Sequence, residues 1–411
     1  MLTKLLVCVT NYEFNENAVL LKEFFGAHFE TILVDSSTPG GCPEADIVIP
    51  NRYYPGLWDE AVSQAIQHNA DWLLFIASDV ELINAEMMQE CIHEALDDSS
   101  IQLWTPSIAH NSRASFKSTF NRFSAGMRLG GVVEGFCFMA RTSLLRSFHP
   151  APKENTFGWH IDVATAIRAH EIGKVAVDDR IMIYHPQKKA EHQIDSSKAF
   201  DLGSNHLKSF GFKEKTLAAV REIENHGSKN LTTPALKVQH SLDLGCGCKP
   251  KDPFKTGHVS GIDVRNPDNR PEIKMSDLFV HPIPHKTSSF DYITAFDFIE
   301  HVPRIMYLDG KCHFCFVELM NEIYRVLKPG GVFASLTPAF PHPEAFQDPT
   351  HVNIITNKTF PLYFCKPRQL ASMYGFKGVF TLINQSSKPS GKLLTLMRAI
   401  KHKGVAGAPT F

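Results

Sequence analysis

One stretch of this chain restricts its fold more than any other, and it runs Leu242-Asp243-Leu244-Gly245-Cys246-Gly247-Cys248-Lys249-Pro250. The residues leading into it are mostly apolar or β-prone and predict a strand, which the two glycines turn sharply because they lack a Cβ. A helix is expected to start nearby and to offer free N–H groups to a polar ligand. Farther on, Gly261-Ile262-Asp263-Val264 predicts a second strand that ends in an acid. Together these features predict the nucleoside-binding half of a doubly wound sheet.

The glycine turn does not match the dinucleotide-binding pattern G-x-G-x-x-G, because Pro250 stands where the third glycine is needed. At these residues the chain instead resembles the class I S-adenosylmethionine-dependent methyltransferases, especially the branch whose first motif is D-L-G-C-G-x-x-P. The resemblance covers about residues 237–377. It continues through three further motifs, which are Ser289-Phe290-Asp291-Tyr292, Phe298-Ile299-Glu300-His301-Val302 and Glu322-Ile323-Tyr324-Arg325-Val326-Leu327-Lys328-Pro329-Gly330-Gly331.

This resemblance implies a Rossmann-like fold with S-adenosylmethionine as the cofactor. Gly245 and Gly247 would let the methionine part of the cofactor approach the backbone, and Asp243 would hold its ammonium group through the turn. Asp263 would accept the hydrogen bonds of the ribose hydroxyls. Asp277 resembles the family's acid at the adenine edge, with a helix N-cap as the alternative interpretation.

Transfer of a methyl group to a hydroxyl also needs a group that removes the hydroxyl proton. Two histidines are the candidates, since imidazole titrates in the useful range. His301 follows the strand expected at Tyr292–Ala295, and His351 lies in a loop after the strand expected at Val332–Leu336. Glu300 either orients His301 or is exposed on a helix.

The N-terminal half alternates predicted strands with predicted helices, which indicates a parallel sheet with its site at the carboxyl ends of the strands. Two acids, Asp35 and Asp79, end two of these strands and are suited to a nucleotide and a divalent cation. The alternative is that they are solvated strand ends. The strands are expected at 4–10, 31–37, 46–50 and 72–81, and the helices at 15–28 and 56–69.

Residues 1–186 resemble the inverting glycosyltransferases of family-two type, which have the nucleotide-diphosphate-sugar-binding fold called GT-A. The segments that carry this resemblance are Val34-Asp35-Ser36-Ser37, Ser78-Asp79, Phe157-Gly158-Trp159-His160-Ile161-Asp162 and Tyr184-His185. It implies that Asp35 contacts the nucleotide and that Asp162 is the catalytic base. Asp79 and His185 would hold a Mn²⁺ or Mg²⁺ ion together with the nucleotide-sugar donor.

Two positions depart from that family's pattern. Ala77 occupies the first acid of the metal motif D-x-D, so Glu81 is a substitute metal ligand in this interpretation. Ile161 replaces the acid expected before Asp162. These departures leave open that the N-terminal half keeps the fold but only holds a glycan.

Composition excludes several classes of function. A net charge of −1 gives no electrostatic case for nucleic acid, and no apolar run approaches a membrane span. Nine scattered cysteines and the absence of a cleavable signal suit a cytoplasmic protein with reduced thiols. A zinc site remains the alternative for one cysteine set, which comprises Cys246, Cys248, Cys312 and Cys315.

We therefore expect a two-domain α/β protein, with a GT-A domain at 1–230 and a methyltransferase domain at 231–411. The first has a core at 1–186 and a helical extension at 187–230. The basic tail 387–403 has helical spacing, which allows either weak contact with a membrane surface or a packed terminal helix. The predicted function is bifunctional: sugar transfer to a glycan acceptor, and methylation of a sugar hydroxyl. The alternatives are a methyltransferase with an inactive glycan-binding domain, and a methyltransferase for a non-sugar molecule or protein.

Overall fold

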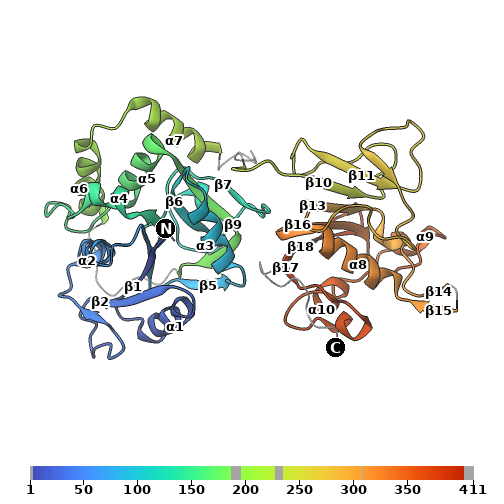
Figure 1. Ribbon diagram of the computed structural model, residues 1–411, viewed down its shortest axis with the longest axis horizontal. Helices are drawn as coiled ribbons and strands as arrows, with labels where there is room; N and C mark the ends of the chain where they lie inside the picture. The colour runs from blue at the N-terminus through green and yellow to red at the C-terminus, as the bar shows by residue number, and fades with distance from the viewer. Residues whose placement is uncertain (1–2, 187–195, 227–234, 309, 402–411) are drawn as a thin grey trace. The chain divides into compact units, whose positions relative to one another are not determined.

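The computed structural model describes residues 3–186, 196–226, 235–308 and 310–401. The chain forms two compact units (Figure 1), the first made of Met1–Arg122 and Met127–Leu236, the second of Phe123–Gly126 and Lys237–Phe411. The domain boundary expected near residue 230 lies outside the described residues. Residues 187–195, at the start of the expected helical extension, also lie outside them. Both units are α/β, as predicted.

The first unit is built on a mixed sheet with the strand order β3-β2-β1-β4-β8-β6-β9-β5, to which β7 is added beside β9. Its strands are β1 (Leu5–Asn11), β2 (Glu30–Asp35), β3 (Ile47–Val48), β4 (Trp72–Ala77), β5 (Glu81–Asn84), β6 (Ile101–Ile108), β7 (Met127–Leu129), β8 (Cys137–Arg141) and β9 (Lys174–Tyr184). Its helices are α1 (Asn15–Gly26), α2 (Tyr53–Gln67), α3 (Met88–Asp97), α4 (Thr142–Leu145), α5 (Ile161–Ile172), α6 (Ser196–Ser209) and α7 (Glu214–His226).

Strand β1 forms the centre of this sheet, because every one of its residues is buried. It pairs in parallel with β2 on one side and with β4 on the other. Asn11 lies opposite Asp35 at the carboxyl end, and Thr10 lies opposite Ala77. Parallel pairing therefore gathers the polar ends of three strands at one edge of the sheet.

The second unit has a sheet in the order β12-β11-β10-β13-β16-β18-β17, with β14 and β15 forming a separate hairpin. Its strands are β10 (Ser241–Leu244), β11 (Val259–Asp263), β12 (Ile273–Met275), β13 (Phe290–Phe296), β14 (Met306–Leu308), β15 (Lys311–His313), β16 (Leu327–Pro338), β17 (Phe380–Ser387) and β18 (Lys392–Ala399). Its helices are α8 (Cys315–Val326), α9 (Glu344–Gln347) and α10 (Thr359–Tyr363), with 3-10 turns η3 (Ile299–His301) and η4 (Leu370–Tyr374).

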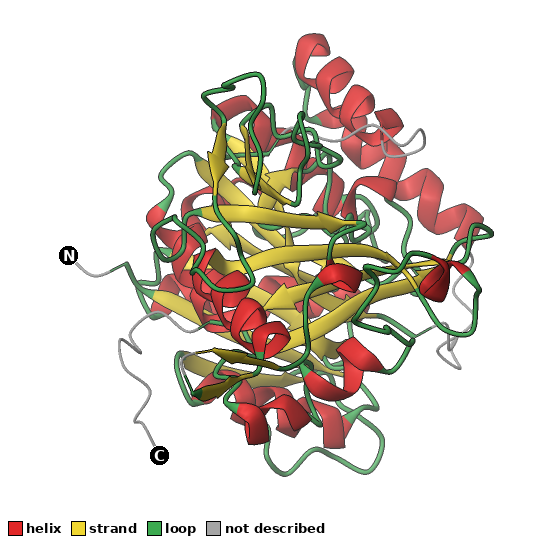
Figure 2. Cartoon of the chain, turned by 90° about the vertical axis from the view of Figure 1, so that its right-hand side faces the viewer, coloured by secondary structure: helices red, strands yellow, loops and turns green. Residues whose placement is uncertain are grey.

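Helix α8 shows how the core of the second unit forms. Its apolar residues recur at three- and four-residue spacing and lie on one face, which packs into the same apolar core as the sheet. Figure 2 shows the helices in red and the strands in yellow. The buried residues of the helix are Cys315, Phe316, Leu319, Met320, Ile323 and Val326.

The helix expected soon after the glycine turn is absent, because residues 245–258 form only turns and bends before β11 begins. Two prolines, Pro250 and Pro253, lie in this connection and have no N–H group to donate. Lys255 also has a positive φ of 54°, which a helix does not permit. The N–H groups near the turn therefore come from loop backbone rather than from a helix N-terminus.

The predicted helix in the basic tail 387–403 is also wrong, since residues 392–399 form β18 between β16 and β17. Apolar residues in this segment fit a two-residue period as well as a helical one, and the two neighbouring strands select the extended form. Three basic side chains of this segment are buried or have polar partners. Arg398 is buried, Lys392 pairs with Asp297, and Lys401 donates to the carbonyl oxygen of Leu327. Within residues 387–401, which the structure describes, no basic amphipathic helix is present.

Candidate functional sites

In the first unit, Asp79 follows β4 and His185 follows β9, and the fold brings the two side chains together. His185 Nε2 lies 3.1 Å from Asp79 Oδ2, while the other ring nitrogen is 2.9 Å from the carbonyl oxygen of Arg113. The ring also stacks on Phe136, with centroids 4.2 Å apart. Burial works to lower the pKa of His185, but the hydrogen bond and charge of Asp79 outweigh it and raise that pKa.

These two atoms have the separation expected of neighbouring ligands on one divalent cation. Ligands at about 2.1 Å in octahedral geometry are about 3 Å apart. Glu81 lies in β5 opposite Tyr184, and its side chain is exposed. Within the described part of the chain it does not complete a three-ligand group with Asp79 and His185.

Asp35 is 1 % exposed, and its carboxylate is hydrogen-bonded within its own neighbourhood. Oδ1 accepts from the side chains of Asn11 at 2.8 Å and Thr38 at 2.5 Å, and Oδ2 accepts from the backbone N–H of Thr38 at 3.0 Å. Its position at the carboxyl end of β2 is as predicted. Its carboxylate, however, is hydrogen-bonded to the loop that follows β2.

Asp162 is the second residue of α5 and lies against Gly135. A Cβ at Gly135 would come within 3.2 Å of Asp162 Oδ2 and 3.0 Å of the Tyr54 hydroxyl oxygen, so a larger residue there would force these side chains to shift. Burial raises the pKa of Asp162 to about 6, although backbone N–H groups of Val163 and Gly135 counteract it. The Tyr54 hydroxyl is buried and has no hydrogen-bond partner among the described residues.

Glu134 is a buried acid that the sequence reasoning missed. It is 7 % exposed, and its Oε1 accepts hydrogen bonds from the backbone N–H groups of Ser115 and Phe116. The pKa of Glu134 is raised to about 7: burial is the largest cause and the charge of Asp162 adds to it, whereas the backbone N–H groups of Phe116 and Ser115 and the charge of His185 act to lower it. The signal for this residue was a single acid within the small and apolar segment 130–140.

The charges of the Asp162 carboxylate and of the His185 imidazole therefore both affect the pKa of Glu134. The predicted base and the predicted metal ligand belong to one electrostatic neighbourhood in the first unit. Two acids there titrate far above their usual range, which suits groups that exchange a proton near neutral pH.

In the second unit, the acids around the glycine turn organise its backbone. Asp243 is 1 % exposed, and its two oxygens accept from the Thr294 hydroxyl at 2.5 Å and from Lys251 N–H at 2.8 Å. Burial raises the pKa of Asp243, although these hydrogen bonds counteract the rise. Asp263, at the end of β11, accepts from the N–H groups of Gly247 at 2.9 Å and Arg265 at 3.1 Å.

The two glycines of the turn have different surroundings. Both have positive φ, 65° at Gly245 and 60° at Gly247. A Cβ on Gly245 would fall 2.5 Å from the ring of Phe298, whereas a Cβ on Gly247 would meet nothing within 4 Å. The backbone at Gly247, next to the half-buried Asp263, is therefore open to a ligand, which fits the predicted cofactor cradle.

Asp277 is exposed and lies in a turn after β12. Its Oδ1 accepts the N–H of Phe279 at 3.0 Å, as in an Asx turn. No helix starts at this residue, so the alternative interpretation as a helix N-cap is wrong.

The two predicted bases of the second unit, His301 and His351, lie together with Glu300. The ring centroids of the histidines are 4.9 Å apart, and ligand atoms of all three residues lie within 4.8 Å of one another. Glu300 is 2 % exposed and accepts a hydrogen bond from the Thr337 hydroxyl at 2.7 Å. Burial raises the pKa of Glu300. Glu300 is therefore not an exposed helix residue.

The alternative zinc site receives no support from the geometry. Cys246 and Cys315 are buried, Cys248 and Cys312 are exposed, and all four are free thiols. Among the described residues, no three cysteines, histidines or acids that include them have ligand atoms within 4.8 Å of one another.

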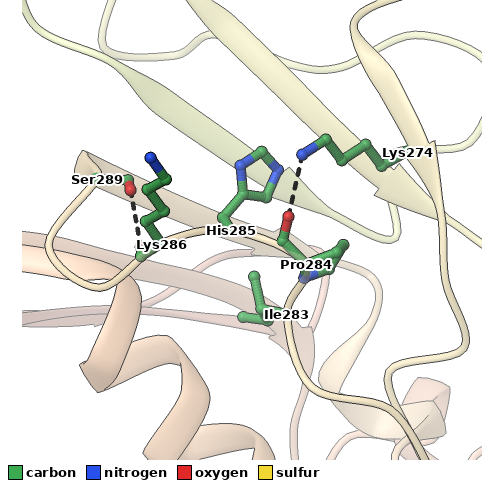
Figure 3. Close-up of a pocket in the computed structure, with 6 residues that line it drawn as sticks. All are labelled: Lys274, Ile283, Pro284, His285, Lys286 and Ser289. Atoms are coloured by element: carbon green, nitrogen blue, oxygen red, sulfur yellow. Dashed lines mark hydrogen bonds between the residues drawn. The ribbon is translucent and has the colours of Figure 1, made fainter.

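A hollow of about 540 Å³ lies away from these groups (Figure 3). Its wall includes Lys274 of β12 and residues of the loop that precedes β13, so the loop part lies at the amino end of that strand. The glycine turn follows the carboxyl end of β10, which runs parallel to β13. Lys274 donates to the carbonyl oxygen of Pro284 at 3.0 Å. This hollow is not the predicted cofactor site.

No helix in the described ranges has the length and apolar character needed to cross a membrane.

The comparisons with known proteins divide along the chain. The family model described as "Methyltransferase domain" matches residues 242–335. No curated protein matches the sequence. Among solved structures, the mannosyltransferase PcManGT from Pyrobaculum calidifontis, in complex with GDP-Man and Mn²⁺, is 13 % identical with a TM-score of 0.40, covering 55 % of this chain and 70 % of its own.

Two further solved structures are similar to parts of the chain. S. aureus TarS in complex with UDP-GlcNAc is 14 % identical with a TM-score of 0.39, and the alignment covers 55 % of this chain and 73 % of that one. The YcgJ protein from Bacillus subtilis is 13 % identical with a TM-score of 0.26, covering 40 % of this chain and 92 % of that one. The predicted resemblance to methyltransferases is confirmed by the family match: the second unit contains a methyltransferase domain.

Proposed function

We propose that this protein is a bifunctional glycan-modifying enzyme. The first unit transfers a sugar from a nucleotide-diphosphate donor, and the second methylates a sugar hydroxyl with S-adenosylmethionine. Joining the two raises the local concentration of the glycosylated product at the second site.

In the methyltransferase domain, S-adenosylmethionine supplies the electrophilic methyl group when it is bound. The open backbone at Gly247 and the carboxylate of Asp263 hold the ribose and methionine parts, while Asp243 keeps the turn in shape. The N–H of His301 donates to the carbonyl oxygen of Phe298 at 3.1 Å, and the ring of Phe298 lies against Gly245, which links the two neighbouring histidines to the turn. In this proposal the acceptor hydroxyl binds beside these histidines and loses its proton there.

In the first unit, Asp79 and His185 would hold a divalent cation, which would supply positive charge to the diphosphate of the donor. Asp162 removes the proton of the acceptor hydroxyl as it attacks the anomeric carbon. Glu134 and the unpartnered hydroxyl of Tyr54 line the same neighbourhood and orient the acceptor.

One observation carries the sugar-transfer half of this proposal. Asp162 lies against Gly135, and the ring of His185 stacks on the next residue, Phe136, so the proposed carboxylate base and the proposed cation-binding histidine flank the same short segment. An inverting transfer needs these two groups near each other, because the base acts on the acceptor while the cation assists the leaving diphosphate.

A second candidate has its own supporting observation. Ala77 stands at the first position of the metal motif, and Glu81 does not join Asp79 and His185 in a three-ligand group in the described chain. A unit with weak cation affinity would hold a glycan for the methyltransferase without transferring sugar.

A mass-spectrometric assay tests the proposal. The purified protein is incubated with a panel of nucleotide-sugars, Mn²⁺, S-adenosylmethionine and glycan acceptors. We expect a product whose mass rises by one sugar and then by one methyl group. Methylation of pre-glycosylated acceptors with no sugar transfer from any donor would favour the second candidate.

A further inference from the structure

Three side chains near the glycine turn have the composition of a metal site. Glu300 and His301 belong to η3 after β13, and His351 belongs to the loop after α9. One oxygen and two ring nitrogens lie within 4.8 Å of one another, and no other group of three such residues occurs in the described chain. Two imidazoles and a carboxylate are a common ligand set for divalent transition metals.

Backbone hydrogen bonds hold the two segments in register. The carbonyl oxygen of Glu300 accepts from the N–H groups of Val352 and Asn353, each at 2.9 Å. The side chain of Asn353 in turn donates to the carbonyl oxygen of Ile299 at 3.1 Å. The loop carrying His351 is thus bonded directly to the turn carrying His301, and these hydrogen bonds keep the two histidines close together.

The hydrogen bonds of both histidines determine which ring nitrogen is free. His351 Nδ1 lies 3.1 Å from the carbonyl oxygen of Glu344, which can only accept, so Nδ1 carries the proton. Thr350 donates its hydroxyl proton to Asp348 at 2.6 Å, so it must accept from His301 Nδ1 at 2.9 Å. In the neutral rings, both Nε2 atoms then present lone pairs, as metal-binding histidines do.

The carboxylate of Glu300 is suited to the same role. It is 2 % exposed, and its described partner is the hydroxyl of Thr337 on Oε2, which leaves capacity on the carboxylate for a further ligand. No lysine or arginine forms an ion pair with it in the part of the chain that is described. A buried carboxylate without a cationic partner is costly, and a bound cation would compensate its charge.

We propose that Glu300, His301 and His351 form a divalent cation site of the two-histidine, one-carboxylate type. Ligands at about 2.1 Å on one ion lie about 3 to 3.4 Å apart, so binding draws together those ligand atoms that are farther apart than this. Asp348 Oδ2, at 3.9 Å from His351 Nε2, is near enough to add a fourth ligand or to accept from a metal-bound water.

The site deepens the proposed function and in this respect rests on it. A cation at this place adjoins the cofactor turn through Phe298 and would bind an oxygen of the acceptor sugar. Coordination lowers the pKa of a bound hydroxyl, and the carboxylate of Asp348, 3.9 Å from His351 Nε2, accepts the proton as the hydroxyl oxygen takes the methyl group. His301 and His351 then act as ligands and not as proton acceptors.

Calorimetric titration with Mn²⁺ and with Zn²⁺ tests the site in the full chain after treatment with a chelator. An Asp79→Ala background removes the cation site predicted in the first unit. We expect one equivalent to bind, and His301→Ala or His351→Ala to weaken binding by more than 100-fold, about the upper bound for outer-shell losses. Thr350→Val, which removes the acceptor for His301 Nδ1–H, should cost about 10- to 100-fold. His281→Ala, an exposed histidine elsewhere, is the control and should change nothing.

Circular dichroism checks that each variant is folded. Absence of binding by both ions, or unchanged affinity in folded His301→Ala and His351→Ala proteins, would overturn the site. Methyl transfer that persists in chelator without bound metal would overturn it too while leaving the proposed function intact. Binding at this site without methylation of any sugar would support the site and contradict the proposed function.

Discussion

The two units begin with the same sheet arrangement and use it differently. The strand order is β3-β2-β1-β4 in the first and β12-β11-β10-β13 in the second, and all neighbouring pairs within these sets are parallel. In each, the order reverses beside the first strand, where doubly wound sheets bind their ligands. In each, the next strand ends in an acid, Asp35 in one and Asp263 in the other.

The surroundings of these two acids differ. Asp35 is buried and accepts three hydrogen bonds from Asn11 and Thr38. Asp263 is half-buried and adjoins Gly247, where a Cβ would meet nothing within 4 Å. Both acids stabilise loop backbone, but only Asp263 lies beside a backbone position, Gly247, that has open space around it. The same topological position therefore supports different chemistry, which depends on what the following loop places over it.

The largest expected effect is on the rate of sugar transfer, which we assign to the first unit alone. Asp162→Asn keeps the side-chain shape but removes a general base, which typically costs about 10²- to 10⁴-fold in rate. Sugar transfer measured by mass spectrometry should fall by this factor, while donor binding and methylation of a pre-glycosylated acceptor remain. Asp201→Asn, an exposed acid of α6, is the control. Impaired methylation through weaker acceptor binding, with no sugar transfer by the parent, would point to a glycan-holding unit.

The next effect concerns the cation of the first unit. Asp79→Ala removes a ligand, and Mn²⁺-dependent binding of the nucleotide-sugar should weaken by at least the roughly 10- to 100-fold loss known for outer-shell partners. Glu81→Ala, two residues away, should have little effect, because Glu81 does not join the pair. Equal donor binding by Asp79→Ala and the parent, with or without Mn²⁺, would show that the metal assignment is wrong.

The matching change in the second unit is Asp263→Ala. Loss of hydrogen bonds to a ribose diol and to the Gly247 N–H should cost on the order of 2 kcal/mol, or about 30-fold in affinity for S-adenosylmethionine. Calorimetric titration measures this, with the exposed Asp268→Ala as control. Sugar transfer by the first unit should be unaffected. An unchanged affinity would refute the role of Asp263.

The smallest effect is on stability. Burial raises the pKa of Glu134 to about 7 from its ordinary value of 4.5, so the folded state binds the proton more tightly than the unfolded state. The stability contribution is therefore fully present below pH 4.5 and is lost as the pH rises through about 7. Glu134→Gln keeps an acceptor for Ser115 and Phe116 and should flatten this decline, so the variant gains stability relative to the parent above pH 7.

Thermal unfolding followed across this pH range measures the effect. Glu16→Gln, an exposed acid in the first turn of α1, serves as the control and should retain the parent's decline. If Glu134→Gln unfolds with the same pH dependence as the parent, Glu134 is ionised in the folded protein at ordinary pH.

The sequence by itself determined the features that depend on neighbouring residues. Glycine at 245 and 247 predicted a turn, and both residues adopt the positive φ that only glycine accepts readily. Apolar runs ending in acids predicted the strands that carry Asp35 and Asp263, because strand burial and strand ends are read from a few consecutive residues. Asp79 and His185 were predicted as partners from a resemblance, and the fold places them together.

Only the tertiary structure decided features that depend on distant segments. The apolar residues of the segment 392–399 fit either a helical period or the two-residue period of a strand. Pairing with β16 and β17 selects the strand. The raised pKa of Glu134 arises from burial under segments far from it in sequence, so no local sequence pattern predicts it. The group of Glu300, His301 and His351 exists because backbone bonds from Val352 and Asn353 attach one loop to another turn. Local sequence determines conformation, whereas burial and the meeting of side chains require the whole fold.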